Sequence, residues 1–112
     1  MRQALADGVE FDVAFVEPAG LRVAVAGGRL GTVATVLRRE PTGRWIAMDH
    51  VKPAAAADEV LELAVPLDSL TLAPGRPDVL SFFIAVTRAG VEVTRYPSYA
   101  PITTRVPPIH AE

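Results

Sequence analysis

The sequence contains no cysteine among its 112 residues. Disulfide bridges, thiolate zinc sites and thiol catalysis are therefore excluded. The chain has only two histidines, His50 and His110. Their positions show no metal-binding spacing with a carboxylate such as Asp49 or Glu112. We therefore expect no metal site and no cofactor.

An excess of basic residues and long hydrophobic runs are also missing. The formal net charge is −2 at pH 7, whereas a nucleic-acid-binding surface needs a basic stripe. No apolar run approaches the roughly 20 residues that span a bilayer. Residues 1–10 contain no apolar stretch typical of a signal peptide. We therefore expect neither nucleic acid nor membrane as a partner. The sequence leaves the compartment open, with the cytoplasm favoured.

Half of the residues are hydrophobic, which is enough to form a core at this length. We predict one domain over residues 9–107. A lead-in over residues 1–8 precedes it, with a short helical turn around Ala4 and Leu5, and a tail over residues 108–112 follows it.

The most regular pattern lies within Glu59–Val86, where apolar and other residues alternate in two runs. Such alternation predicts strands with one buried face. Pro66 ends the first strand because it has no N–H group for the ladder. The connector is expected to contain one helical turn at Leu67–Leu70 and a reversal at Pro74-Gly75. The predicted buried faces consist of Leu61, Leu63 and Val65 in the first strand, and Leu80, Phe82, Ile84 and Val86 in the second.

Alternating or β-branched segments of similar length fill much of the remaining chain. Residues 9–15 and 21–25 are expected to form a hairpin, and Gly90 is expected to supply a positive φ in a later hairpin turn. The further strands are predicted at residues 32–38, 44–49, 91–96 and 102–106. In the strand at 32–38 the buried face stays open between Val33, Thr35 and Leu37 on one side and Ala34 and Val36 on the other.

Proline precedes the alanine run Ala54–Ala57, which we expect to be an extended loop or a single turn. The ten prolines and eight glycines fall mostly between the apolar runs. This spacing predicts a single immunoglobulin-like antiparallel β-sandwich of roughly seven or eight strands.

A family resemblance is carried by the segments LELAVPLDSLTLAPG, SFFIAVTRAGVEVTRYP and ITTRVP within Leu61–Pro107. This part of the chain resembles the C-terminal β-sandwich domain of family 57 glycoside hydrolases. It is also similar to DOMON-like domains and to family 9 carbohydrate-binding modules. One departure is Arg76-Pro77, which stands between Gly75 and the acidic Asp78.

The resemblance implies an accessory module of a carbohydrate-active protein. In such enzymes the catalytic acids lie in a separate barrel, which this chain lacks, so no catalytic residue carries over. The expected partner is a catalytic domain in the same or another chain, and an α-glucan is one candidate ligand.

Exposed aromatic rings are the usual platforms for sugars. Trp45 is exposed if Ile46 and Met48 point inward, and it fills the core if the register is reversed. The candidate carbohydrate-binding residues are Trp45, Arg44, Arg95, Tyr96 and Tyr99.

A glycosidase would instead need paired carboxyl groups. Glu10 and Asp12 share one strand face. We expect both to be solvated, because nothing in the neighbouring sequence predicts the burial that would raise one pKa. No catalytic residue is therefore assigned, and we expect a non-enzyme.

Two alternatives come from other classes. Some DOMON-like domains hold haem b between a methionine and a histidine or lysine, and Met48, His50 and Lys52 have these residue types on one strand edge. The other alternative is a structural protein that forms a homo-oligomer through its edge strands.

Overall fold

The computed structural model describes residues 2–28, 31–49, 51–57, 61–65 and 79–105. One short helix and nine strands occur in this part of the chain, and every strand pairing is antiparallel. The elements are α1 (Arg2–Ala6), β1 (Val9–Glu17), β2 (Leu21–Gly28), β3 (Gly31–Arg39), β4 (Trp45–Ala47), β5 (Ala54–Ala57), β6 (Leu61–Ala64), β7 (Val79–Arg88), β8 (Val91–Tyr96) and β9 (Ile102–Arg105).

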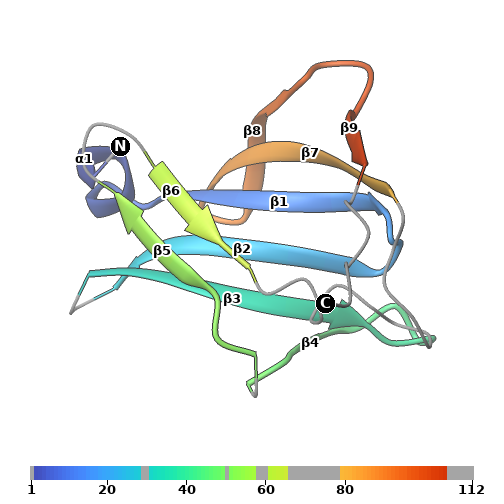
Figure 1. The fold of residues 1–112 in the computed structure, drawn as a ribbon. Coiled ribbons are helices and arrows are strands. Elements are labelled where there is room, and N and C mark those ends of the chain that lie inside the picture. The colour runs from blue at the N-terminus through green and yellow to red at the C-terminus, as the bar shows by residue number, and fades with distance from the viewer. Residues whose placement is uncertain (1, 29–30, 50, 58–60, 66–78, 106–112) are drawn as a thin grey trace, which may run out of the picture.

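The strands form two layers of unequal size (Figure 1). Seven strands build the large sheet in the order β4-β3-β2-β1-β7-β8, and β9 pairs with β7 beside β8. The small sheet consists of β5 and β6, which cross in front of β1, β2 and β3 in Figure 1. The protein is therefore an all-β sandwich, as the sequence predicts.

The core lies between the two layers, on the face of the large sheet that we call the inner face. Leu21, Val23, Val25 and Val36 are its largest fully buried side chains. Leu63 of the small sheet packs against them from the other layer. Alternate residues of both hairpin strands lie in or against this core, namely Val9, Phe11, Val13 and Phe15 of β1 and Leu21, Val23 and Val25 of β2.

The structure also shows which face of β3 is buried, a point on which the sequence allows two alternatives. Val36 is 0% exposed and Ala34 packs on the core, whereas Val33 is 51% exposed on the opposite face.

The expectation of a loop or single turn at Ala54–Ala57 is wrong, because this segment is strand β5. It pairs residue by residue with β6, and Ala55 and Ala57 pack against the cluster around Phe11 and Val25. Strand preference depends strongly on such neighbours, so pairing outweighs the weak intrinsic preference of alanine.

The two patterned runs of Glu59–Val86 belong to different sheets, because β6 pairs with β5 and β7 lies in the large sheet. The helical turn expected at Leu67–Leu70, the reversal at Pro74-Gly75 and the tail at residues 108–112 lie outside the described residues.

The hairpin between β7 and β8 turns at Ala89 and Gly90, which have φ angles of 52° and 78°. Two successive positive φ angles are typical of the tight turn that matches the twist of paired strands, and the expectation for Gly90 is confirmed. Beyond the turn, Thr87 pairs with Glu92 but Val86 pairs with Thr94. Val93 is therefore the extra residue of a β-bulge.

Helix α1 confirms the helical turn expected around Ala4 and Leu5, and Leu5 is buried in the core. The helix lies close to β2 at Gly27, where a Cβ atom would stand 2.9 Å from the backbone oxygen of Leu5. Glycine at this position therefore allows the contact. No helix in the described part of the chain is long and apolar enough to cross a membrane.

Candidate functional site

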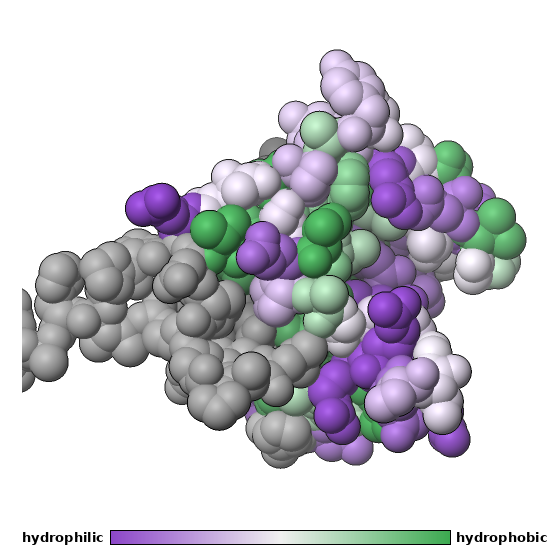
Figure 2. All heavy atoms as spheres, turned by 90° about the vertical axis from the view of Figure 1, so that its right-hand side faces the viewer, coloured by the Kyte–Doolittle hydropathy of each residue, from purple (hydrophilic) through white to green (hydrophobic). Residues whose placement is uncertain are grey.

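The face of the large sheet that points away from the small sheet is hollowed. We call this cavity of about 490 Å³ the outer hollow. Figure 2 views the molecule from the end of the strands, and its outline is indented on the side away from the grey residues. Strands β1, β2, β3, β4, β7 and β8 all contribute to the lining. The charged and aromatic residues of the lining include Asp12, Arg22, Arg39, Trp45, Glu92 and Arg95.

Small residues between long ones explain the depression. Asp12 pairs across the ladder with Ala85, and Ala85 pairs with Arg95, so a methyl group separates two charged side chains. Ala14 lines the hollow one position further along the same face. Because side chains alternate between faces, these alanines lie opposite the apolar core residues of the same strands.

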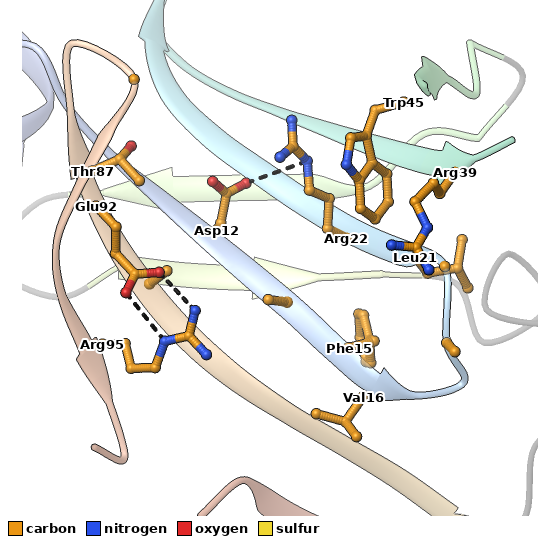
Figure 3. Close-up of a pocket in the computed structure, with 15 residues that line it drawn as sticks. Asp12, Phe15, Val16, Leu21, Arg22, Arg39, Trp45, Thr87, Glu92 and Arg95 are labelled. Carbon is orange, nitrogen blue, oxygen red and sulfur yellow. Dashed lines mark hydrogen bonds and ion pairs between the residues drawn. The ribbon is translucent and has the colours of Figure 1, made fainter. Parts of the chain in front are cut away.

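Trp45 lies in the outer hollow between two arginines (Figure 3). The Cζ atom of Arg22 is 4.8 Å from the centroid of the indole ring, and that of Arg39 is 5.9 Å from it. Both distances are within the range of cation–π attraction. Met48 packs against the core instead. Trp45 therefore faces outward, and the alternative in which it fills the core is wrong.

Asp12 and Arg22 point toward each other from adjacent strands (Figure 3). Oδ1 of Asp12 and Nε of Arg22 are 3.9 Å apart, which is too long for a hydrogen bond. Both atoms are buried, and neither has a hydrogen-bond partner among the described residues.

Burial raises the pKa of Asp12 above its ordinary value of 3.8, the charge of Arg22 opposes this rise, and Glu10 adds to it. The expectation that Asp12 is simply solvated is therefore wrong. The reason is its position among residues of β2 and β7, which no local pattern reveals.

Glu92 and Arg95 form the second charged pair of the hollow. Arg95 donates from Nη2 to Oε1 at 2.7 Å and from Nε to Oε2 at 3.3 Å. These hydrogen bonds lower the pKa of Glu92 below its usual 4.5. The Cζ atom of Arg95 also stands 4.9 Å from the ring centroid of Phe83. The bulge at Val93 makes the pair, because it brings residues three positions apart to the same face of the sheet.

Only two of the five predicted carbohydrate-binding residues lie in the outer hollow. Trp45 and Arg95 both line the outer hollow. Arg44 is exposed and does not line it. Tyr96 is 67% exposed and pairs with Ile84, whose side chain packs on the core, and Tyr99 is 94% exposed in the loop after β8. These three residues are therefore not members of the site.

The residues of the haem alternative are not brought together where the structure describes them. Met48 packs on the core and Lys52 is exposed. His50 lies outside the described residues. A search of the described chain for groups of three or more metal-binding side chains finds none.

Arg22, Arg39 and Glu92 of the hollow are not among the residues that the sequence indicates, and Asp12 is expected there only as a solvated carboxylate. A usable signal did exist. Asp12 and Arg22 occupy the positions that alternate with buried residues, and their neighbours at the same parity, Ala14 and Ala24, are small. Alternation alone thus indicates charged side chains among small ones on one sheet face, whereas the burial of Asp12 follows only from its cross-strand partners.

Comparisons with known protein families, curated proteins and solved structures find no match for this chain. The outer hollow is therefore the feature of this molecule that points to a function.

Proposed function

We propose that the protein is a non-catalytic accessory module of a carbohydrate-active protein, and that it binds glycan in the outer hollow. The observation that carries this proposal is the hollow itself, a cavity of about 490 Å³ with an outward-facing Trp45 among charged side chains. Ligand sites are typically concave and combine apolar surface with a few polar groups that fix orientation.

The lining offers a saccharide both kinds of hydrogen-bonding group. Guanidinium groups donate only, and ionised carboxylates accept only, so Arg22 and Glu92 can bind different hydroxyls. The short side chains of Ala14 and Ala85 leave room for the sugar ring. The hollow thus binds and orients a ligand without making or breaking a covalent bond.

The experiment is affinity electrophoresis in gels that contain starch, glycogen, dextrin or pectate. We expect retardation in at least one gel, and Trp45→Ala should abolish it. Tyr99→Ala is the matched control, because this ring is exposed outside the hollow. Unchanged migration in all gels would overturn glycan binding.

The non-catalytic part of the proposal has its own test. A glycosidase needs one carboxyl group with a raised pKa and a second one suitably placed, and here the carboxylate of Glu92 is held by Arg95. We expect no release of reducing sugar from any retarding polysaccharide. Hydrolysis that disappeared in both Asp12→Asn and Glu92→Gln would overturn this part.

A second candidate, an oligomerisation domain, is favoured by strand β8. All six residues of β8 are exposed, and Val91, Val93 and Tyr96 are 67%, 66% and 67% exposed. The strand ends the ordered path of the large sheet. An edge with unpaired backbone groups can add a strand from another chain.

The sequence of β8 is complementary to itself in one antiparallel register. If Val93 lies opposite Thr94 of a second copy, Glu92 lies opposite Arg95 and Val91 lies opposite Tyr96. Opposite charges and apolar pairs across strands are stabilising.

Size-exclusion chromatography with light scattering should then detect a dimer. Glu92→Arg should weaken it, and the exchange Glu92→Arg with Arg95→Glu should restore it. A strict monomer at high concentration would overturn this candidate.

A further inference from the structure

The charged side chains of the outer hollow are not balanced in pairs. The guanidinium of Arg95 is held by the carboxylate of Glu92. Arg39 has neither a hydrogen bond nor an ion pair from its side chain to any residue that the structure describes, and its contact is the ring of Trp45. Nε of Arg22 faces the carboxylate of Asp12 at 3.9 Å but lacks a hydrogen-bond acceptor within the described chain. The end of the hollow at Trp45 therefore has one guanidinium charge, that of Arg39, without a carboxylate partner among the described residues, and a second guanidinium, that of Arg22, whose partner Asp12 is too far away for a hydrogen bond.

The contact with Trp45 leaves the donors of both guanidinium groups available. Cation–π attraction draws a guanidinium group to the ring, whereas its N–H groups radiate from the edge of its own plane. A guanidinium held in this way can still bind a planar anion with two parallel hydrogen bonds. Arg22 and Arg39 flank one ring in Figure 3, so Trp45 holds two such groups next to each other.

The other end of the hollow has the opposite character. Glu92 and Thr87 lie there, at the end of the hollow opposite Trp45 (Figure 3), and the small lining residues Ala14 and Ala85 belong to the strands between them. A carboxylate and a hydroxyl group are good partners for sugar hydroxyls, but an ionised carboxylate would repel an anion. A ligand that fits both ends has an acidic group at one end and hydroxyl groups along the rest.

We infer that the outer hollow binds an acidic saccharide, a uronic-acid glycan, whose carboxylate is held by Arg39 and Arg22. This inference rests on the proposed function and specifies its ligand. Trp45 acts mainly by positioning the two arginines, and the ring of the sugar lies over Ala14 and Ala85. A neutral α-glucan offers the arginine end no anionic partner.

The test compares each acid with its own neutral ester. Binding of trisaccharides of galacturonate, glucuronate and mannuronate, and of their methyl esters, is measured by isothermal titration calorimetry. At least one acid should bind about tenfold or more tightly than its ester, because a charge-assisted bidentate hydrogen bond is lost in the ester.

A matched pair of variants locates the effect on the sheet. Arg39→Gln should weaken the acid about tenfold and leave the ester unchanged. Arg38→Gln is the control, because Arg38 is exposed on the same strand and pairs with Leu21 of the inner face. It should change neither affinity by more than about twofold. Trp45→Ala should weaken the acid although it removes no charge.

Each outcome decides the inference. Equal affinity for acid and ester, equal effects of Arg38→Gln and Arg39→Gln, or displacement of the sugar by inorganic phosphate at similar concentration would overturn it. If no uronate binds but neutral polysaccharides retard the protein through Trp45, the inference fails and the proposed function stands. If neither binds, both fail.

Discussion

The two faces of the large sheet are built by the same strands and have opposite properties. On the inner face, Val23 of β2 and Val36 of β3 are 0% exposed beneath the small sheet. On the outer face, the neighbouring position of β2 carries Arg22, and β1 carries Asp12. One step along a strand therefore separates the core from a charged cavity.

The difference shows how the two faces are specified. The inner face is fixed by the amount of apolar surface removed from water, which any well-fitting apolar residue supplies. The outer face depends on individual contacts, such as the arginines at Trp45 and the pair of Glu92 and Arg95. Substitutions on the inner face should mainly change stability, and those on the outer face should mainly change binding and titration.

The largest contrast is expected between two valines of one strand. Val36→Asp places a charge in the core and should cost several kcal/mol, enough to prevent folding of a domain with ordinary stability. Val33→Asp places the same charge at a position that is 51% exposed and should change stability by about 0.5 kcal/mol or less. Urea denaturation followed by circular dichroism measures the stability of both variants. Similar losses of stability would contradict the difference assigned to the two faces.

A smaller loss is expected at Gly27, where helix α1 contacts β2. Gly27→Ala should cost about 1–3 kcal/mol, because the new Cβ atom meets backbone atoms of Leu5 that cannot move alone. The double variant with Gly27→Ala and Leu5→Ala tests this explanation. If Gly27→Ala alone already displaces helix α1, the stability losses of the two substitutions will be less than additive in denaturation experiments. Full additivity would contradict this explanation.

A pH-dependent effect is expected at Asp12. Because its pKa is raised in the folded protein above 3.8, the folded state binds the proton more tightly than the unfolded state. Stability is therefore lost as the pH rises from 3.8 through the folded pKa. Asp12→Asn removes this dependence, so the variant should gain stability relative to the wild type across that window. A difference that is constant from acid to neutral pH, in denaturation experiments, would contradict the assigned cause.

The smallest effect is expected at the exposed pair of Glu92 and Arg95. Exposed ion pairs contribute little because water and salt screen them, so Glu92→Gln should leave the unfolding midpoint unchanged. The pair should be visible in titration instead. The pKa of Glu92, followed by NMR, should lie below 4.5 in the wild type and rise in Arg95→Gln. An unchanged pKa of Glu92 in Arg95→Gln would show that the two side chains are not paired in solution.

Much of the inner face could be predicted from the sequence, because alternation along a strand is a local property. The patterns of Phe11 and Val13 in β1 and of Val23 and Val25 in β2 assign their buried face directly. The prediction failed where the local signal was weak. Alanines in Ala54–Ala57 carry no apolar pattern of their own, and their strand depends on β6.

The outer hollow could be predicted only in part, because its members meet through the pairing of distant segments. Residue type alone indicates Trp45 and Arg95, yet their common face follows from the register of β3 with β4 and of β7 with β8. The burial of Asp12 likewise depends on its partners Ala24 and Ala85. No local pattern contains these relations.

The bulge at Val93 has a consequence for the evolution of this cavity. An acidic and a basic residue three positions apart normally fall on opposite sides of a strand, and here one inserted residue aligns them. Deleting Val93 would leave Glu92 and Arg95 two positions apart in a regular strand, which also places them on one face. The rim of the cavity can therefore tolerate the loss of one residue from the chain at this point, because the bulged and the regular strand both keep the acidic and the basic side chain together.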